Sequence, residues 1–374
     1  MNELLTIVIP TMNRPEFLKR ALTYYSSESC PYRMMICDSS TGEKLDSNIE
    51  TISYYQHELK ITHIYNKLVR SSTRKASGWQ EDPLLEDVMS YIDTPYVAFF
   101  ADDDFAVTTN FQTCLQILED NPDISFVCGE AAIFEITMDH SKEITYGDVN
   151  NITRYALRSV SENSAIGRLS SLLLNYNVLE YGISRTEQMS YRWSKIYNAK
   201  LDNLSSELLN CFLVVIQGKV KKIDKLTLVR QAHSLMTSRI GKDEFEWFSS
   251  VFFPKSFQSL FDIVVHDLSD KDGISYECAY SEVKRMFWRY THTSLSRKYI
   301  FTYNTSRTIT SKIVAFLREM YKKGGLIFYI VRMMRYIHSL YYSSSGHISI
   351  NTVSMRSSPF HADLSRVIKV VSNK

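Results

Sequence analysis

Three consecutive acidic residues, Asp102, Asp103 and Asp104, follow directly on the apolar run at residues 96–100. A short run rich in Val and Phe is typical of a buried strand. Adjacent carboxylates repel one another, and three roles could explain them here: a solvated turn, a set of helix-capping charges, or a divalent-cation site. Mg²⁺ and Mn²⁺ prefer oxygen ligands, commonly one or two carboxylates together with substrate phosphates. Zinc is disfavoured because no thiolates lie nearby in the sequence.

The acids must be positioned by the elements around them. Short apolar runs that indicate strands occur at residues 4–10, 33–40, 61–66, 96–100 and 124–129. Helical patterns alternate with them, as at residues 110–120. This alternation predicts an α/β structure with a mostly parallel sheet.

The next part of the chain is less regular in pattern. Residues 130–200 are expected to be irregular and polar. Residues 204–224 predict a helix that ends at Gly218 and is followed by a short strand.

Polar residues follow several of the predicted strands at the point where each strand ends. These are Pro10 with Thr11, Asp38 with Ser39, and the acids at 102–104. In parallel α/β sheets, ligands bind beyond the carboxyl ends of the strands. We therefore expect these groups to meet along one edge of the sheet.

The length of 374 residues is large for a single core, so one large domain with an appendage, or two domains, is expected. From Lys284 to the end, 16 Lys and Arg face two acids, a net charge of +14, which leaves −12 on residues 1–283. The pattern after residue 243 is helical, aromatic and basic. We place the main boundary near residue 240, which gives segments 1–240 and 241–374.

The basic C-terminal region favours an anionic partner. Its segment 312–342 has a longest uncharged run of eight residues, 324–331, too short to span a bilayer. Interleaved cationic and apolar residues fit an interfacial amphipathic helix. The alternatives are a helical subdomain or a dimer interface that packs on the acidic body. Nucleic acid is disfavoured, since no recognisable binding module is present.

The six cysteines are scattered and form no C-x-x-C pair, which favours free thiols in a reducing compartment. The first strand candidate begins at Leu4, with no signal-peptide pattern before it. A cytoplasmic protein is therefore expected, with peripheral attachment to the inner face of the membrane as a further hypothesis.

Three segments in order, "TIVIPTMNRPEFLKRAL", "MMICDSST" and "TPYVAFFADDDF", resemble the nucleotide-sugar domain of family 2 glycosyltransferases, which have the GT-A fold. The resemblance covers residues 4–235 and is strongest over the first 130. It implies a metal-dependent, inverting enzyme that transfers a sugar from a nucleotide diphospho-sugar, usually UDP-linked, to a hydroxyl acceptor. A saccharide or lipid-linked saccharide of cell-surface polysaccharide synthesis is the implied acceptor.

The resemblance also implies roles for residues in the first half of the chain. Pro10, Thr11 and Arg14 match the loop beside the nucleotide, and Asp38 matches the acid that hydrogen-bonds the base. Asp103 matches the direct ligand of Mn²⁺ or Mg²⁺, with Asp104 beside it as a further metal-binding residue and Asp102 near the ribose or the waters of the metal. Ala101 stands where many members have a further Asp.

The second half supplies the implied base and further contacts. Glu207 is the first choice as general base and Asp202 the second, although Glu207 could instead be a helix N-terminal charge. His233 is a candidate metal or diphosphate contact, or a surface histidine. Arg230 could clamp phosphates, and Tyr176 or Tyr181 could stack on a sugar or pack in the core.

Two other classes of function remain compatible with the sequence. A sugar-phosphate nucleotidyltransferase also combines an α/β sheet with metal-binding acids, but its first loop is usually Gly-rich, whereas "PTMNRPE" has no glycine. A non-catalytic nucleotide-sugar-binding scaffold of the same fold is the other alternative.

Overall fold

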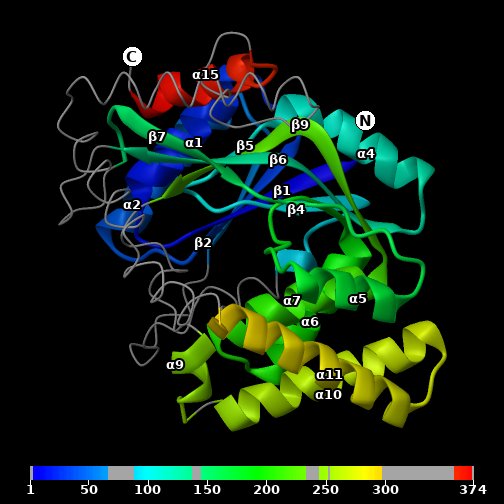
Figure 1. Cartoon of the computed structure of the whole chain (residues 1–374). Helices are drawn as coiled ribbons and strands as arrows, with labels where there is room; N and C mark the ends of the chain where they lie inside the picture. The colour runs from blue at the N-terminus through cyan, green and yellow to red at the C-terminus, as the bar shows by residue number, and fades with distance from the viewer. Residues whose placement is uncertain are drawn as a thin grey trace, which may run out of the picture.

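The computed structural model describes residues 3–65, 88–136, 145–232, 244–251, 253–296 and 358–372. Within these ranges, nine strands form one sheet, with helices packed against both of its faces (Figure 1). The sheet has two halves that differ in the direction of their strands.

The first half of the sheet is parallel. Its order is β3 (Ile61–Tyr65), β2 (Arg33–Asp38), β1 (Leu5–Thr11) and β4 (Tyr96–Phe99). All four strands are those that the sequence predicts. Because they run in one direction, their carboxyl ends lie at the same edge.

The second half mixes directions. The short strand β8 (Ile183–Arg185) pairs antiparallel with β4 and with β6 (Ile124–Ile136), and β6 pairs parallel with β9 (Lys219–Ala232). At the far side, β5 (Phe105–Ala106) and β7 (Val149–Tyr155) pair antiparallel with β9 and β6. Six of the nine strands share one direction, so the prediction of a mostly parallel α/β sheet is confirmed.

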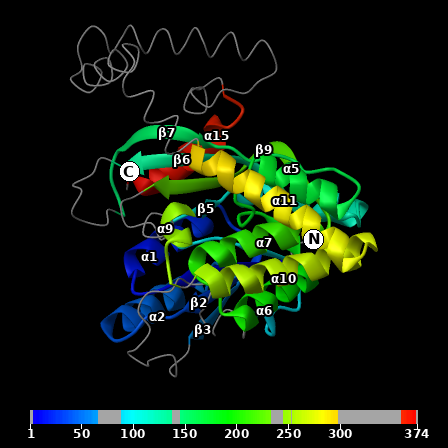
Figure 2. The same ribbon diagram turned by 60° about the horizontal axis from the view of Figure 1, so that its bottom comes forward.

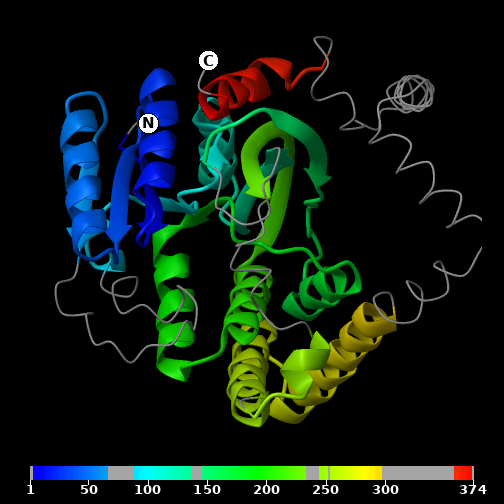
Figure 3. The same ribbon diagram turned by 90° about the vertical axis from the view of Figure 1, so that its left-hand side faces the viewer.

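Helices cover both faces of the parallel half. Ile7 and Ile9 of β1 pack in one apolar cluster with Leu18 of α1 (Pro15–Ser27), whereas Val8 packs in a second cluster with Trp193 of α6 (Thr186–Ala199). Successive side chains of a strand point to opposite faces, so a strand covered on both sides is apolar throughout. Figure 3 shows α1 beside α2 (Glu43–Tyr55) on the first face.

The prediction that residues 130–200 are irregular is wrong. β6 continues to Ile136, and β7, α5 (Ala165–Leu174), β8 and α6 follow it. α5 begins where the Ser164 hydroxyl accepts a hydrogen bond from the Gly167 N–H at 3.1 Å. α6 carries Arg192 on its inner face, where that side chain is 1% exposed and donates to neutral groups of Ser184, Asn210 and Gln217. A charged residue on the buried face conceals the amphipathic pattern of this helix.

The predicted helix that ends at Gly218 is confirmed as α7 (Asn203–Gln217), although the strand after it, β9, has 14 residues and is not short. Asp202 caps the start of α7, because its Oδ1 accepts from the Ser205 N–H at 3.0 Å. Arg168 of α5 satisfies carbonyl groups in the last turn. Both ends of the helix that carries Glu207 are therefore fixed by side chains.

The later helices pack on this body. α10 (Phe253–Asp272) contacts α5, α6 and α7, and α11 (Tyr276–Leu295) contacts α5 and the short α9 (Glu244–Phe248) (Figure 2). The helix α15 (His361–Val371) returns to α1, where Arg366 forms an ion pair with Glu28 at 2.8 Å. A 3₁₀ turn (Thr108–Asn110) leads into α4 (Phe111–Asp120), which packs against β6. The predicted boundary near residue 240 lies outside the described residues.

No helix within the described ranges is long and apolar enough to cross a membrane. The basic segment 312–342 lies outside these ranges, so its role stays a prediction. All six cysteines are free thiols, as expected from their spacing.

The cap that Arg168 places on α7 can be tested through stability. Its Nε donates to the carbonyl oxygen of Val215 at 2.6 Å and its Nη2 to that of Ile216 at 3.0 Å. Arg168→Met leaves these buried carbonyls unpaired, so we expect the free energy of unfolding to fall by about 2–4 kcal/mol. Urea unfolding followed by circular dichroism measures the change. The matched control is Arg158→Met, at an exposed position, and equal losses in the two variants would contradict the assignment.

Candidate active site

The carboxyl ends of the parallel strands bring the predicted polar groups together. Thr11 at the end of β1 is in register with Asp38 at the end of β2, and the Ser39 N–H donates to the Thr11 carbonyl at 2.9 Å. The Thr11 hydroxyl donates to Asp102 Oδ2 at 2.8 Å. The predicted meeting of these groups at one sheet edge is thus confirmed for Thr11, Asp38 and the loop 101–104 that follows β4. Pro10 precedes Thr11 in β1 and pairs in register with Cys37.

Arg14 joins the first two acids. Its Nη1 lies 3.0 Å from Asp102 Oδ1 and its Nη2 lies 2.9 Å from Asp103 Oδ2. The guanidinium also stacks over the Phe17 ring, 4.2 Å from its centroid. One cation therefore bridges two neighbouring carboxylates, which reduces the repulsion between them.

Asp104 belongs to a separate network with β9. Its Oδ2 accepts from Arg230 Nε at 3.0 Å and its Oδ1 accepts from the Gln231 N–H at 3.2 Å. The Arg230 guanidinium lies over the rings of Tyr181 and Tyr155, at 4.4 and 5.2 Å. Asp104 thus ties the acid loop to the end of β9 through a buried ion pair.

Arg20 lies behind the acid loop and is fully buried. Its Nη2 donates to the Asp103 carbonyl at 2.9 Å, and its Nη1 donates to Gln231 Oε1 at 2.5 Å. The guanidinium is packed between the rings of Phe17 and Phe105. Burial lowers the pKa of Arg20 to about 10, so it stays a cation at neutral pH.

The three acids are matched by three arginines that the chain itself supplies. Burial nevertheless raises the pKa of Asp102 to about 7 and that of Asp104 to about 6, although Arg14 and Arg230 lower them. The arginines therefore offset only part of the cost of burying the carboxylates. A further cation beside them would favour their ionised forms.

The residues present fit a hard divalent cation. Asp102 Oδ1 and Asp103 Oδ2 converge on one guanidinium, so two carboxylate oxygens already face a single cationic group. The described part of the chain has no cluster of three or more His, Cys, Asp or Glu suited to a metal. A cation at this site would thus take its remaining ligands from diphosphate oxygens and water, as Mg²⁺ commonly does. His233, also predicted as a ligand, lies outside the described residues.

Asp38 is held as an ionised acceptor. Its carboxylate accepts from the Ser40 N–H at 2.8 Å and from Asn48 Nδ2 at 2.9 Å, and His63 Nε2 lies 3.2 Å away. Burial raises the pKa of Asp38, but these hydrogen bonds more than offset it and bring the pKa below its usual range. The Asp38 side chain is 0% exposed, so in this structure it is a fixed, buried acceptor at the end of β2.

The two candidate bases differ in their surroundings. Glu207 is half-buried in the second turn of α7, where Tyr176 donates a hydrogen bond to its Oε1 at 3.0 Å. The oxygens of Asp202 accept from Ser205 and from Trp247 Nε1, the latter at 3.1 Å. Asp202 therefore holds α7 and α9 in place.

The ring of Tyr155 lies 5.2 Å from the guanidinium of Arg230, the partner of Asp104. Burial raises the pKa of this tyrosine, Arg230 lowers it, and Glu207 raises it further. The ring of Tyr155 thus lies within electrostatic reach of both Glu207 and Arg230, which pairs with Asp104.

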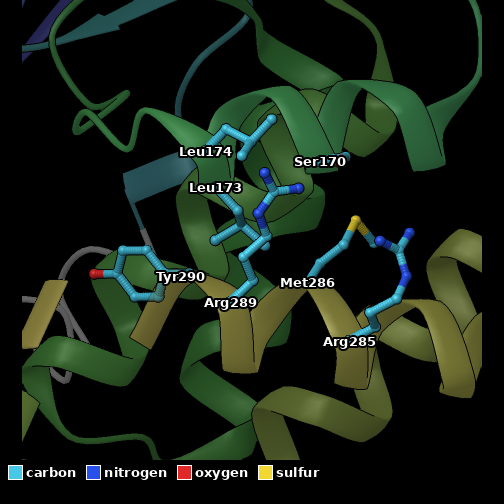
Figure 4. Close-up of a pocket in the computed structure, with 7 residues that line it drawn as sticks. All are labelled: Ser170, Leu173, Leu174, Arg285, Met286, Arg289 and Tyr290. Atoms are coloured by element: carbon cyan, nitrogen blue, oxygen red, sulfur yellow. The ribbon is translucent and has the colours of Figure 1, made fainter. Parts of the chain in front are cut away.

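A small pocket lies between α5 and α11 (Figure 4). It is lined by Ser170, Leu173, Leu174, Arg285, Met286, Arg289 and Tyr290. One of its lining residues, Tyr290, has its ring 5.2 Å from that of Tyr176. The pocket therefore lies beside the place where α11 packs against Tyr176, which donates a hydrogen bond to Glu207.

Several residues of the site are missing from the sequence prediction. Arg20 and Asn48 lie on the inner faces of α1 and α2, and His63 lies in β3. The one signal for Arg20 and Asn48 is a polar residue at a position where helical spacing calls for an apolar one. Gln231 gives no signal, because its role depends on where β9 ends.

Comparisons with known proteins identify the fold. No protein-family model and no curated protein sequence matches the chain. The crystal structure of S. aureus TarS 1–349 in complex with UDP-GlcNAc is similar, with a TM-score of 0.50 at 10% identity, over 78% of this chain and 74% of that one. A longer S. aureus TarS structure gives a TM-score of 0.48 at 9% identity, over 76% of this chain but only 42% of that one.

A second protein is more distant. Glucosyl-3-phosphoglycerate synthase from Mycobacterium tuberculosis, in complex with Mn²⁺, UDP and glucosyl-3-phosphoglycerate, gives a TM-score of 0.35 at 14% identity, over 73% of this chain and 81% of that one. At such identities, similarity to TarS establishes the fold alone. The chain has the GT-A fold.

The buried ion pair of Asp104 with Arg230 can be tested by unfolding. Asp104→Asn leaves the buried guanidinium without its carboxylate, so we expect the free energy of unfolding to fall by about 3–5 kcal/mol. Adding Arg230→Met removes the unpaired charge and should recover part of the loss. Urea unfolding of the single and double variants measures both effects.

The control for this cycle is Asp93→Asn, which breaks an exposed pair with Arg33 and should cost less than about 1 kcal/mol. If Asp104→Asn costs no more than Asp93→Asn, the pair does not hold the loop to β9.

Proposed function

We propose that the chain is a glycosyltransferase that transfers a sugar from a nucleotide diphospho-sugar, with UDP as the nucleotide, to a hydroxyl acceptor. The observation that carries the proposal is the meeting of Thr11, Asp38 and the acid loop at the carboxyl edge of the sheet. Ligands bind at this edge in α/β sheets. A fold does not define a reaction, so the proposal depends on these residues and their chemistry.

The sheet edge supplies groups for each part of the donor. Asp38 is an ionised acceptor that suits the N3–H of a uracil, and Pro10 and Thr11 would line the nucleotide. Arg14 would pair with the diphosphate. UDP-sugars are the first donors to test, because the TarS structure of the same fold contains UDP-GlcNAc.

Asp102 and Asp103 would hold Mn²⁺ or Mg²⁺, and a bound cation stabilises the charge of a leaving diphosphate. Asp104 would keep its ion pair with Arg230. Its role would be to hold the acid loop in position. His233 stays a candidate contact to the metal or the diphosphate.

Glu207 would act as the general base. It would accept the proton of the acceptor hydroxyl while that oxygen bonds to the anomeric carbon and the bond from this carbon to the diphosphate breaks. Attack from the face opposite the diphosphate inverts the configuration. The hydrogen bonds of Asp202 with Ser205 and Trp247 support a structural role for that residue, which makes Glu207 the better candidate.

We propose a saccharide or lipid-linked saccharide used in cell-surface polysaccharide synthesis, with the enzyme acting in the cytoplasm. The basic segment 312–342 would then attach to the anionic inner face of the membrane.

Binding of nucleotide diphosphates tests the proposal directly. Titration calorimetry with UDP, CDP, GDP and ADP, each with and without Mn²⁺, should give the tightest binding for UDP with Mn²⁺. Absence of binding for all four would contradict a nucleotide-sugar donor. Binding without turnover of any UDP-sugar would favour a non-catalytic scaffold.

The role of Glu207 is tested by Glu207→Gln. We expect the rate of UDP release from a UDP-sugar, with water as the acceptor, to fall by about 10²–10⁴-fold, because the general base is lost. The Kd for UDP should stay unchanged, since Glu207 would act on the acceptor and not on the nucleotide. Glu187→Gln, an exposed glutamate in the first turn of α6, is the matched control. An undiminished rate in Glu207→Gln would assign the base to another residue.

A further inference from the structure

Arg14 differs from the other two arginines at the acids. Arg20 is 0% exposed, and the side chain of Arg230 is 13% exposed, whereas that of Arg14 is 24% exposed. The guanidinium groups of Arg20 and Arg230 each lie over two aromatic rings, and that of Arg14 stacks on the Phe17 ring. Arg14 therefore has the most exposed side chain of the three, and its two terminal nitrogens are the best placed to change partners.

The backbone at Arg14 is fixed, so that any movement there belongs to its side chain. Its carbonyl accepts from the N–H groups of Phe17 and Leu18 in the first turn of α1. The preceding residue, Asn13, has a φ of 58° and is held by Ser40 and Thr41 at 2.7 and 3.1 Å.

Arg14 also occupies carboxylate oxygens that would ligate a divalent cation in the proposed function. Its two terminal nitrogens contact Asp102 Oδ1 and Asp103 Oδ2, one oxygen of each acid that would hold the cation. Two cationic groups on one pair of oxygens repel each other. The acids therefore cannot keep both the guanidinium and a divalent ion in this geometry.

We propose that Arg14 is an exchangeable counter-cation: it holds Asp102 and Asp103 when the donor is absent, and it moves to the donor diphosphate as a divalent cation binds. The proposal rests on the proposed function, since the second partner of Arg14 is a diphosphate. Cation and diphosphate then bind cooperatively, because the diphosphate receives the guanidinium that the cation displaces. Cooperativity of this kind is a coupling free energy between two ligands, and it is reciprocal.

The test is the affinity for Mn²⁺ itself, measured from the free-ion signal in electron paramagnetic resonance. Arg14→Ala removes the internal competitor, so we expect Mn²⁺ alone to bind about tenfold more tightly than to the parent chain. In the parent, inorganic pyrophosphate should tighten Mn²⁺ binding, and Arg14→Ala should lose most of this effect. Titrations are made near pH 8, where protons compete least for the carboxylates.

Three further variants complete the design. Asp103→Asn should abolish Mn²⁺ binding, which locates the ion, and Arg14→Lys should keep part of the coupling to pyrophosphate. Arg33→Ala, which removes an exposed arginine paired with Asp93, controls for the loss of one positive charge and should leave Mn²⁺ binding unchanged. Circular dichroism confirms that each variant is folded.

The outcomes separate this proposal from the proposed function. Weaker or unchanged Mn²⁺ binding in folded Arg14→Ala would overturn the exchange, whether or not UDP binds. Mn²⁺ binding that stays intact in Asp103→Asn would overturn it as well. A tighter Mn²⁺ site with lost coupling to pyrophosphate would support it even if no UDP-sugar is turned over.

Discussion

The compensation of three consecutive buried carboxylates by three arginines is the interaction on which the rest of the site depends. Asp102, Asp103 and Asp104 are at most 8% exposed, and three buried charges of one sign would not be tolerated without partners. Arg14 and Arg230 each pair directly with carboxylates, and Arg20 adds a positive charge behind the loop. Arginines of the same chain thus compensate the adjacent like charges.

These arginines come from separate parts of the fold and thereby join them at the acid loop. Arg14 directly precedes α1, and Arg20 lies on the inner face of that helix. Arg230 lies near the end of β9, more than 200 residues later. Figure 1 shows β1, β4 and β9 as strands of the same sheet, with α1 packed against it. The same contacts that make burial tolerable also set the distance between the first strand, the acid loop and the last strand. The contacts between these arginines and the acids therefore determine both the stability and the geometry of the site.

The sequence predicts the parallel half of the sheet and its polar edge well, because each strand is a short apolar run that ends in polar residues. It does not predict which acid meets which arginine. Asp104 looks equivalent to Asp103 in the sequence, yet it faces β9 and pairs with Arg230 across 126 positions. α6 is missed for a related reason: Arg192 is buried among neutral partners, so the helix lacks a clean apolar face. Long-range pairing of polar groups leaves no periodic signal.

The most direct test of the account is a crystal structure of the chain with UDP and Mn²⁺. The account predicts uracil against Asp38, an anomalous Mn²⁺ peak between the carboxylates of Asp102 and Asp103, and the Arg14 guanidinium on the diphosphate. Asp104 should still pair with Arg230. Electron density for UDP away from the carboxyl edge of the sheet, or a bound complex in which Arg14 still bridges Asp102 and Asp103, would contradict it.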